Sequence, residues 1–232
     1  MNLPKPIRRA CSVMSSLTKF QNRSQAGQLL GERLAYLASE RPVVLALPRG
    51  GVPVAYEVAQ ALASPLDVLV VRKLGVPFHP EFAFGALGED DAQVLNTQFV
   101  QQLGLSNDTI AEVTRHERAE LIRRVALYRG DRPALALIGR TVVIVDDGLA
   151  TGATARVAVE VARARGAKTI IVAVPVSPRE TVAELRTLAD EVISLRVPAR
   201  FEAVGEWYED FSQTSDDEVT SLLGKSSNTD QP

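Results

Sequence analysis

The sequence predicts an α/β fold in which helices flank a doubly wound, mainly parallel sheet. Short apolar runs alternate along the chain with helical patterns, and glycine or proline often marks the junctions between them. The first example is the apolar run 43–47, which is bounded by Pro42 and Pro48 and is followed by a helical stretch at 54–62 and a second apolar run at 66–71. Strand, turn, helix and strand in this order make a βαβ unit, so the two strands are expected to be parallel.

The rest of the chain repeats this alternation, with one interruption. We expect helices at 24–40, 106–129 and near 216–223, a helix that ends at Gly166, and strands at 141–145, 169–176 and 191–195. The interruption is the segment 72–91, where glycine and proline recur and Phe82 and Phe84 indicate at most one short strand. A long irregular segment inside a compact domain is usually functional or mobile.

Composition limits the class of protein. The chain has 232 residues, of which 46% are hydrophobic and 23% are charged, which is enough for one domain with a sizeable core. A net charge of −2 disfavours nucleic-acid binding, and no apolar run reaches the ~18 residues of a membrane-spanning helix. The single cysteine, Cys11, excludes a disulfide framework and favours a reducing, cytoplasmic location.

The two ends of the chain have no periodic apolar face. Residues 1–22 are basic and lack the apolar stretch of a secretory signal, so they predict a disordered tail. Residues 224–232 read as a polar C-terminal tail, which leaves 23–223 as the folded domain.

The clearest chemical signal follows the strand at 141–145. Two acids, Asp146 and Asp147, stand at its end, and the turn Gly148-Leu149-Ala150-Thr151-Gly152-Ala153-Thr154 leads into a helix. Backbone amides, threonine hydroxyls and the helix N-terminus can together bind a phosphate. The paired carboxylates can accept hydrogen bonds from the vicinal hydroxyls of a ribose. A sugar with a 5-phosphate would satisfy both parts of this segment.

Residues 142–154 resemble the 5-phosphoribosyl 1-pyrophosphate (PRPP) signature of type I phosphoribosyltransferases, and the resemblance extends over most of 23–223. It implies that Asp146 and Asp147 bind the ribose 2- and 3-hydroxyls and that the following turn, through Thr154, binds the 5-phosphate. It also implies Mg²⁺ as cofactor, held largely by PRPP and water, with the two acids contacting it indirectly. A small hood subdomain, expected at 196–212, would cover the acceptor.

The resemblance extends to the cations. The loop after the first strand grips pyrophosphate in related enzymes, often through an unusual peptide geometry, and this role falls on Arg49, Gly50 and Gly51. Arg72 and Lys73, at the end of the second strand, are further candidates for the pyrophosphate.

The segment 74–86 resembles in position the flexible loop that closes over PRPP and excludes water. It contains His79 and Glu81. A single loop histidine is more often simply exposed, and His116, on the long helix, is expected to face solvent without a role.

The acceptor is the least determined part. Phe201, Trp207 and Tyr208 are candidates for stacking on a flat ring, although they fit a small satellite core equally well, and Val176 is a further candidate for the acceptor pocket. Enzymes for 6-oxopurines carry an aspartate at the position of Ala150 and a lysine within 170–176, and both are missing here. The resemblance therefore disfavours 6-oxopurine acceptors.

Three hypotheses follow for the function. The first is transfer of the phosphoribosyl group from PRPP to a small nitrogenous acceptor, with Asp146, Asp147, Arg49 and Lys73 as catalytic residues. The second is a PRPP sensor or regulatory module that has lost the chemistry. The third is an enzyme acting on another phosphorylated sugar, which leaves the pyrophosphate-type loop without a purpose. Dimers are common in the family, so a homodimer is expected.

Overall fold

The main layer of the fold is a five-stranded parallel sheet. The computed structural model describes residues 19–77, 79–89 and 92–227. The strands lie in the order β2-β1-β6-β7-β8, and every neighbouring pair is parallel. Their bounds are β1 (Val43–Ala46), β2 (Leu66–Val68), β6 (Thr141–Val145), β7 (Thr169–Val176) and β8 (Glu191–Arg196). The strand order reverses between β1 and β6, so the predicted doubly wound sheet is confirmed.

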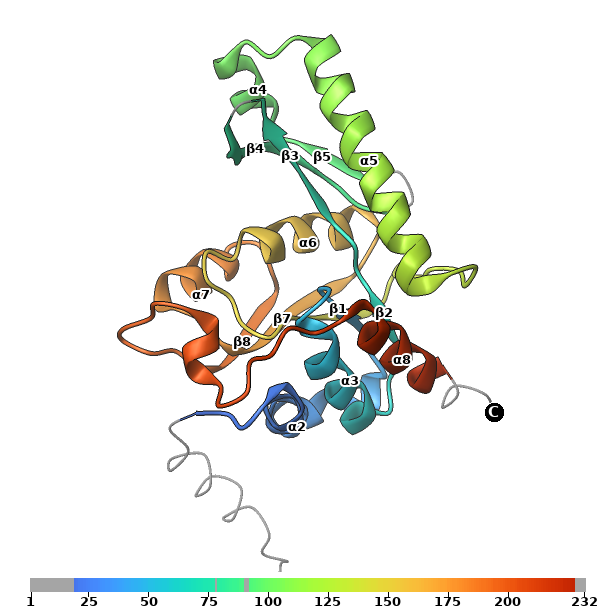
Figure 1. Ribbon diagram of the computed structural model, residues 1–232, viewed down its shortest axis with the longest axis vertical. Helices are drawn as coiled ribbons and strands as arrows, with labels where there is room; N and C mark the ends of the chain where they lie inside the picture. Colours follow the sequence, from blue (N-terminus) through green and yellow to red (C-terminus); the bar gives the residue numbers. More distant parts are fainter. Residues whose placement is uncertain (1–18, 78, 90–91, 228–232) are drawn as a thin grey trace, which may run out of the picture.

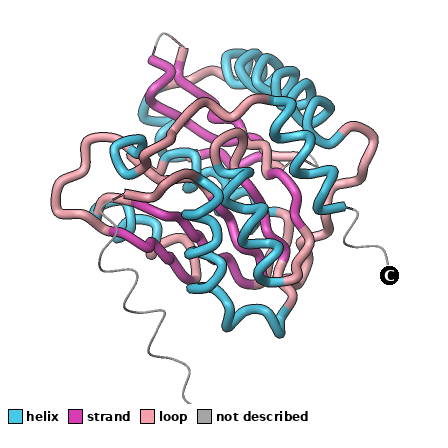
Figure 2. The backbone as a smooth tube through the Cα atoms, turned by 60° about the horizontal axis from the view of Figure 1, so that its bottom comes forward, coloured by secondary structure: helices cyan, strands magenta, loops and turns pink. Residues whose placement is uncertain are grey.

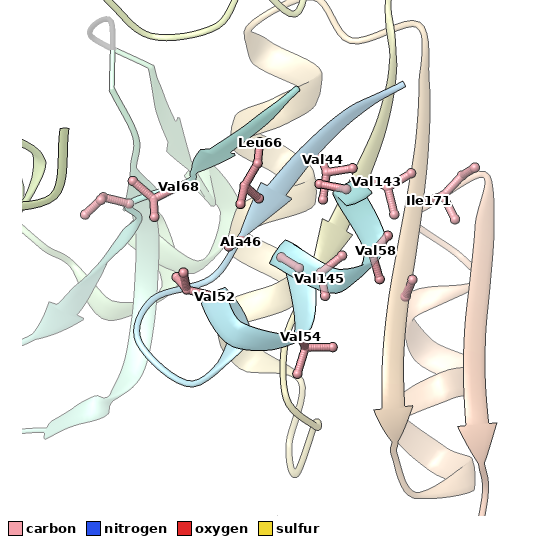
Figure 3. Packing of buried hydrophobic residues seen from close by; sticks show 14 of the residues in the cluster. Val44, Ala46, Val52, Val54, Val58, Leu66, Val68, Val143, Val145 and Ile171 are labelled. Atoms are coloured by element: carbon pink, nitrogen blue, oxygen red, sulfur yellow. The ribbon is translucent and has the colours of Figure 1, made fainter. Parts of the chain in front are cut away.

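Each strand divides its side chains between two apolar layers. Val44, Val143 and Ile171 belong to one layer, which they share with α3 (Gly51–Leu62) (Figure 3). Their neighbours in sequence belong to the opposite layer, which contains the buried face of α6 (Ala153–Ala164). Successive side chains of a strand point to opposite faces, so this sheet needs helices on both sides.

The remaining helices complete the two layers. Helices α2 and α8 lie on the α3 side of the sheet and α7 lies on the α6 side (Figure 1). The bounds are α2 (Arg23–Leu34), the 3-10 helix η1 (Ala35–Glu40), α7 (Arg179–Leu185), the 3-10 helix η2 (Val204–Trp207) and α8 (Asp216–Ser227).

A second, antiparallel sheet stands beside the first. It has the order β3-β4-β5 and contacts α5 and α6, so it forms a separate layer with α5 alongside it (Figures 1 and 2). The bounds are β3 (Arg72–Val76), β4 (His79–Leu87), β5 (Gln93–Leu95), α4 (Thr97–Leu103) and α5 (Asn107–Arg129). The prediction of a long irregular segment at 72–91 was therefore wrong.

The glycines of this region explain the error. A side chain at Gly85 would lie 2.5 Å from the carbonyl oxygen of Val94, and one at Gly88 would lie 2.2 Å from a methyl group of Val161. These glycines allow close packing within and against the small sheet, although in the sequence they look like turn residues. Pro80 is tolerated because β4 pairs with β5 only from Gly85 onwards, which leaves the outer part of β4 with one partner strand.

A buried ionic cluster joins the two sheets. The guanidinium of Arg129, at the end of α5, donates to Asp67 Oδ1 of β2 over 3.0 Å and to Glu89 Oε1 over 3.1 Å. It also donates to the carbonyl of Val68 over 2.9 Å, and all three charged residues are buried. Buried charges are stable only when they are paired and hydrogen-bonded, so this cluster fixes the small sheet and α5 against the edge of the parallel sheet.

The ends of the folded domain differ from the prediction. Phe20 was placed in a disordered tail over 1–22, yet it is buried against Tyr208 and Ala26. Helix α8 continues to Ser227, so the segment predicted as a polar tail from 224 begins inside a helix. Residues 1–18, including Cys11, and residues 228–232 lie outside the described residues. Every helix within the described ranges is too short or too polar to span a bilayer.

Arg129 provides a test of the cluster. Replacing Arg129 with methionine leaves two buried carboxylates without a cation, and we expect the free energy of unfolding to fall by about 3–5 kcal/mol. Chemical denaturation measures this change. The control is Arg123→Ala on the same helix, where an exposed arginine pairs with Glu120 and little change is expected. Equal stability of the two variants would show that the cluster does not hold the sheets together.

Candidate functional site

The candidate site lies where the strand order reverses. Strands β1 and β6 are paired in register, with Ala46 opposite Val145, so they end at the same level. The turn after β1 (48–50) and the turn after β6 (146–152) therefore meet at one edge of the sheet. Open parallel sheets bind ligands at the carboxyl ends of the strands at this reversal point.

Two glycines allow the turns to meet. A side chain on Gly50 would lie 2.0 Å from Asp147 Oδ2, and one on Gly51 would lie 2.7 Å from the carbonyl oxygen of Val145. The Pro48–Arg49 peptide is cis, as the resemblance led us to expect for this loop. The Gly51 amide donates to the Leu47 carbonyl over 3.1 Å, so Gly51 serves close approach and leaves no amide for a ligand.

The acid pair is half-buried and only partly hydrogen-bonded. Asp146 Oδ1 accepts from the Asp147 amide over 2.9 Å, and Asp147 Oδ2 accepts from the Arg23 guanidinium over 2.8 Å. The other oxygen of each carboxylate accepts no hydrogen bond from the described residues. Each acid therefore keeps one oxygen for a ligand hydroxyl.

Burial and mutual repulsion control the ionisation of the pair. Burial raises the pKa of Asp146 well above its usual range, and the neighbouring charge of Asp147 raises this pKa further. Burial also raises the pKa of Asp147, while its hydrogen bond and ion pair with Arg23 oppose that rise. Perturbed carboxyl groups of this kind cluster at functional sites.

The turn after the acids leaves backbone amides for an anion. Gly152 has φ +68°, a conformation that favours glycine, and helix α6 begins immediately after it. The amides of Ala150, Thr151 and Gly152 donate to no acceptor in the described part of the chain. Leu149 and Ala153 contribute differently, since the Leu149 amide donates to the Val176 carbonyl and the Ala153 amide donates to Thr151 Oγ1. The phosphate-binding capacity of the turn thus rests on these free amides, the α6 N-terminus and the threonine hydroxyls.

The predicted cations are distributed over three environments. Arg49 lies 3.8 Å from Asp216 at an exposed position, where such a pair contributes little. Arg72 donates to Glu117 of α5 over 2.7 Å, so its charge is already compensated. Lys73 forms no ion pair with the described residues and lines two cavities. Both Arg72 and Lys73 begin β3, because β2 ends at Val68, and the prediction that they end the second strand was wrong.

A cavity of about 1080 Å³ adjoins the edge of the parallel sheet at which the acid pair lies. Its wall combines Pro48 and Thr154 from the parallel sheet with Lys73 and with the inner face of α5. His116 belongs to that face and lines the cavity, while it stays exposed to solvent as the sequence predicted. The side chains of His79 and Glu81, predicted for the closing loop, lie outside the described residues.

The hood segment (196–212) does not present its aromatic residues as predicted. Tyr208 is buried between the rings of Phe20 and Phe211, and Val176 is fully buried beside the turn after β6. Trp207 packs against the same cluster, and its indole nitrogen is buried without a partner among the described residues.

The satellite core, which the sequence left as an alternative, therefore accounts for Tyr208 and Trp207, while Phe201 is half-buried ahead of η2. Tyr208 also contacts the site, because its hydroxyl donates to the Asp147 carbonyl over 2.5 Å.

Arg23 also contacts the acid pair, although the sequence did not predict it as a site residue. The side chains of Arg23 and Asp147 are only 12% and 14% exposed, although the two residues are 124 positions apart. The sequence offered one signal, an arginine at the start of a helix, where a cation is unfavourable to the helix dipole and therefore needs another reason to be there.

The two acids are expected to affect stability in opposite directions. A carboxyl whose pKa is raised in the folded state lowers stability progressively as the pH rises from its unfolded-state pKa to its folded-state pKa, and the full cost is present above the latter. Asp146→Asn removes this cost, and we expect the free energy of unfolding to rise by roughly 1 kcal/mol near neutral pH, with the gain disappearing in acid. Asp147→Asn deprives Arg23 of its carboxylate and should lower stability by about 1–3 kcal/mol. Chemical denaturation of both variants at neutral and acidic pH tests this, and an equal loss in both would contradict it.

Similarity to known proteins identifies the family of this chain. The family model described as "Phosphoribosyl transferase domain" matches residues 21–211. The proteins named "Putative phosphoribosyl transferase" in two strains of Mycobacterium tuberculosis are 53% identical over 206 residues, which cover 89% of this chain and 46% of theirs. The chain thus spans about half the length of these curated relatives. The crystal structure of TT1426 from Thermus thermophilus is 44% identical with a TM-score of 0.83, covering 89% of this chain and 98% of that one. The chain therefore belongs to the phosphoribosyl transferase domain family.

Proposed function

We propose that this chain transfers the 5-phosphoribosyl group of PRPP to a nitrogen nucleophile and releases pyrophosphate. The observation that carries the proposal is the contact between the two turns at the strand reversal, where Gly50 lies directly against Asp147. A sugar-binding acid pair, a turn with free amides and the loop that carries Arg49 meet at one edge of the sheet. PRPP carries a diol, a phosphate and a pyrophosphate, so a single molecule can engage all three parts.

Each part of PRPP has a partner of matching chemistry. The ribose hydroxyls would donate to the unoccupied oxygens of Asp146 and Asp147, and the 5-phosphate would accept from the amides of the turn after β6. The pyrophosphate would lie toward Arg49, the Gly50 amide and Lys73. Lys73 lines the same cavity as Pro48, the residue before Arg49. Arg72 is assigned no direct role because Glu117 holds its guanidinium.

The residues fit a Mg²⁺ ion that is held indirectly. Among the described residues no three His, Cys, Asp or Glu side chains gather as a metal site, and one Asp147 oxygen is occupied by Arg23. The free carboxylate oxygens suit contact with metal-bound water, whereas a protein cage would need more ligands. When bound, Mg²⁺ would neutralise part of the pyrophosphate charge.

The chain contributes mainly orientation and charge. The nitrogen nucleophile attacks C1 of the ribose as the bond from C1 to the pyrophosphate oxygen breaks, and the electron pair of that bond leaves with pyrophosphate. Negative charge builds on the leaving group, where Arg49 and Lys73 stabilise it, while the acid pair fixes the sugar. The acceptor we propose is not a 6-oxopurine, because Ala150 stands where enzymes for those bases carry an aspartate.

Pyrophosphate release tests this function. With PRPP and Mg²⁺ we expect turnover for at least one member of a panel of adenine, orotate, nicotinate and simple amines, and none for hypoxanthine or guanine. Calorimetry with PRPP is the parallel measurement. Tight PRPP binding without pyrophosphate release in the presence of any acceptor would favour the regulatory module. Failure to bind PRPP would reject both the transferase and the regulatory module.

Gly50 provides a sharper variant. A methyl group at this position would lie 2.0 Å from Asp147 Oδ2 and must displace the carboxylate, so Gly50→Ala should lower kcat/KM for PRPP by about 100-fold. The matched control is Gly224→Ala, where a methyl group meets nothing within 4 Å, and unchanged kinetics are expected. Unchanged kinetics in Gly50→Ala would show that the turn contact does not matter for catalysis.

A further inference from the structure

Arg23 is held by three different groups around the acid pair. Its Nε donates to Asp147 Oδ2 over 2.8 Å and its Nη1 donates to the carbonyl of Ser212 over 2.7 Å. The guanidinium also lies 4.0 Å from the centre of the Phe211 ring, which is cation–π distance. Three directional contacts fix a planar guanidinium in one orientation, which a lysine ammonium cannot reproduce.

The N-terminal arm (residues 20–23) is built into the hood segment. The Phe20 amide donates to the Trp207 carbonyl, and the Glu209 amide donates back to the Phe20 carbonyl, each over 2.8 Å. The Asp210 amide donates to the Gln21 carbonyl over 2.9 Å, and the Phe20 ring packs on Tyr208. The position of Arg23 is thus set by the hood rather than by α2 alone.

Asp147 is surrounded by few charged or titratable groups. Arg23 approaches it from α2, Asp146 precedes it at the end of β6, and the Tyr208 hydroxyl donates to its carbonyl. From the loop after β1 it meets Gly50, which carries no charge. Arg23 is therefore the cation that balances the two neighbouring carboxylates, and it uses only one of the two Asp147 oxygens.

We propose that Arg23 is a positioning residue of the sugar-binding site, which holds the Asp147 carboxylate in one orientation so that Oδ1 receives a ribose hydroxyl. The inference rests on the proposed function for the identity of the sugar, but the contact itself does not depend on it. It assigns a role to an arm that lies outside the signature segment 142–154 and joins that segment to the hood.

The pH dependence of binding follows from this arrangement. Arg23 makes the largest contribution that opposes the rise in the Asp147 pKa caused by burial, so without it the carboxyl protonates at higher pH. A protonated Asp147 is a poorer acceptor for a hydroxyl, so PRPP binding should weaken on acidification sooner than in the wild type. A purely structural role for Arg23 would weaken binding equally at every pH.

The experiment compares Arg23→Ala, Arg23→Lys and Arg33→Ala, an exposed arginine on the same helix that serves as the control. PRPP affinity is measured by calorimetry with Mg²⁺ from acidic to slightly basic pH. We expect Arg23→Ala to bind PRPP about tenfold more weakly at neutral pH. The acid limb of its binding profile, which is the fall in PRPP affinity on acidification, should move to higher pH. Arg23→Lys should keep the wild-type acid limb while losing affinity, and Arg33→Ala should match the wild type.

Two outcomes would overturn the proposal. One is wild-type affinity and pH profile in Arg23→Ala, and the other is the same acid limb in Arg23→Ala and Arg23→Lys. If Arg23→Ala does not fold, the lysine variant decides alone: an acid limb moved to higher pH despite the retained charge contradicts the proposal. A carbon-13 titration of the Asp147 carboxyl in wild type and variants does not require PRPP. If the wild type binds no PRPP, the proposed function fails, while an unmoved Asp147 titration is what would reject the role of Arg23.

Discussion

The site depends on the contact between Gly50 and Asp147. The parallel pair β1–β6 ends both strands at one level, and the two following turns then compete for the same space. A side chain on Gly50 would lie 2.0 Å from Asp147 Oδ2 in the second turn, and one on Gly51, the first residue of α3, would lie 2.7 Å from the Val145 carbonyl oxygen at the end of β6. The spacing between the acid pair and the loop that carries Arg49 is therefore set by backbone packing. Residues with a side chain at positions 50 and 51 would not permit such a short spacing.

Placing two carboxylates at this contact is unfavourable for the fold. Burial raises the pKa of both carboxyl groups, and the two groups repel each other when both are ionised. The protein does not neutralise the pair completely, because only Asp147 receives a cation and one oxygen on each acid stays open. Incomplete compensation of this kind is typical of binding sites, where stability is reduced so that a ligand can complete the hydrogen bonds.

The parallel core was predictable because its signals are local. Apolar runs such as 141–145, alternating with helical patterns, determine the layers without knowledge of long-range contacts. The acid pair and its turn were predictable for the same reason, since all their residues lie within 146–154. The small sheet was not predictable, because Gly85 and Gly88 look like turn residues until their tight neighbours are known. Arg23 and Tyr208 were missed or misassigned because their partners are 124 and 61 positions away.

The small sheet has a further consequence for the site. Lys73 belongs to β3, whereas Arg49 and Thr154 follow strands of the parallel sheet, so the three residues lie on two separate layers. The distance from Lys73 to the other two therefore depends on how the layers are oriented. The buried cluster of Arg129, Asp67 and Glu89, which lines no part of the cavity, is one of the contacts that hold that orientation. An ionic cluster outside the cavity thus contributes to the position of Lys73, which gives a physical reason for burying three charges at the junction of the sheets.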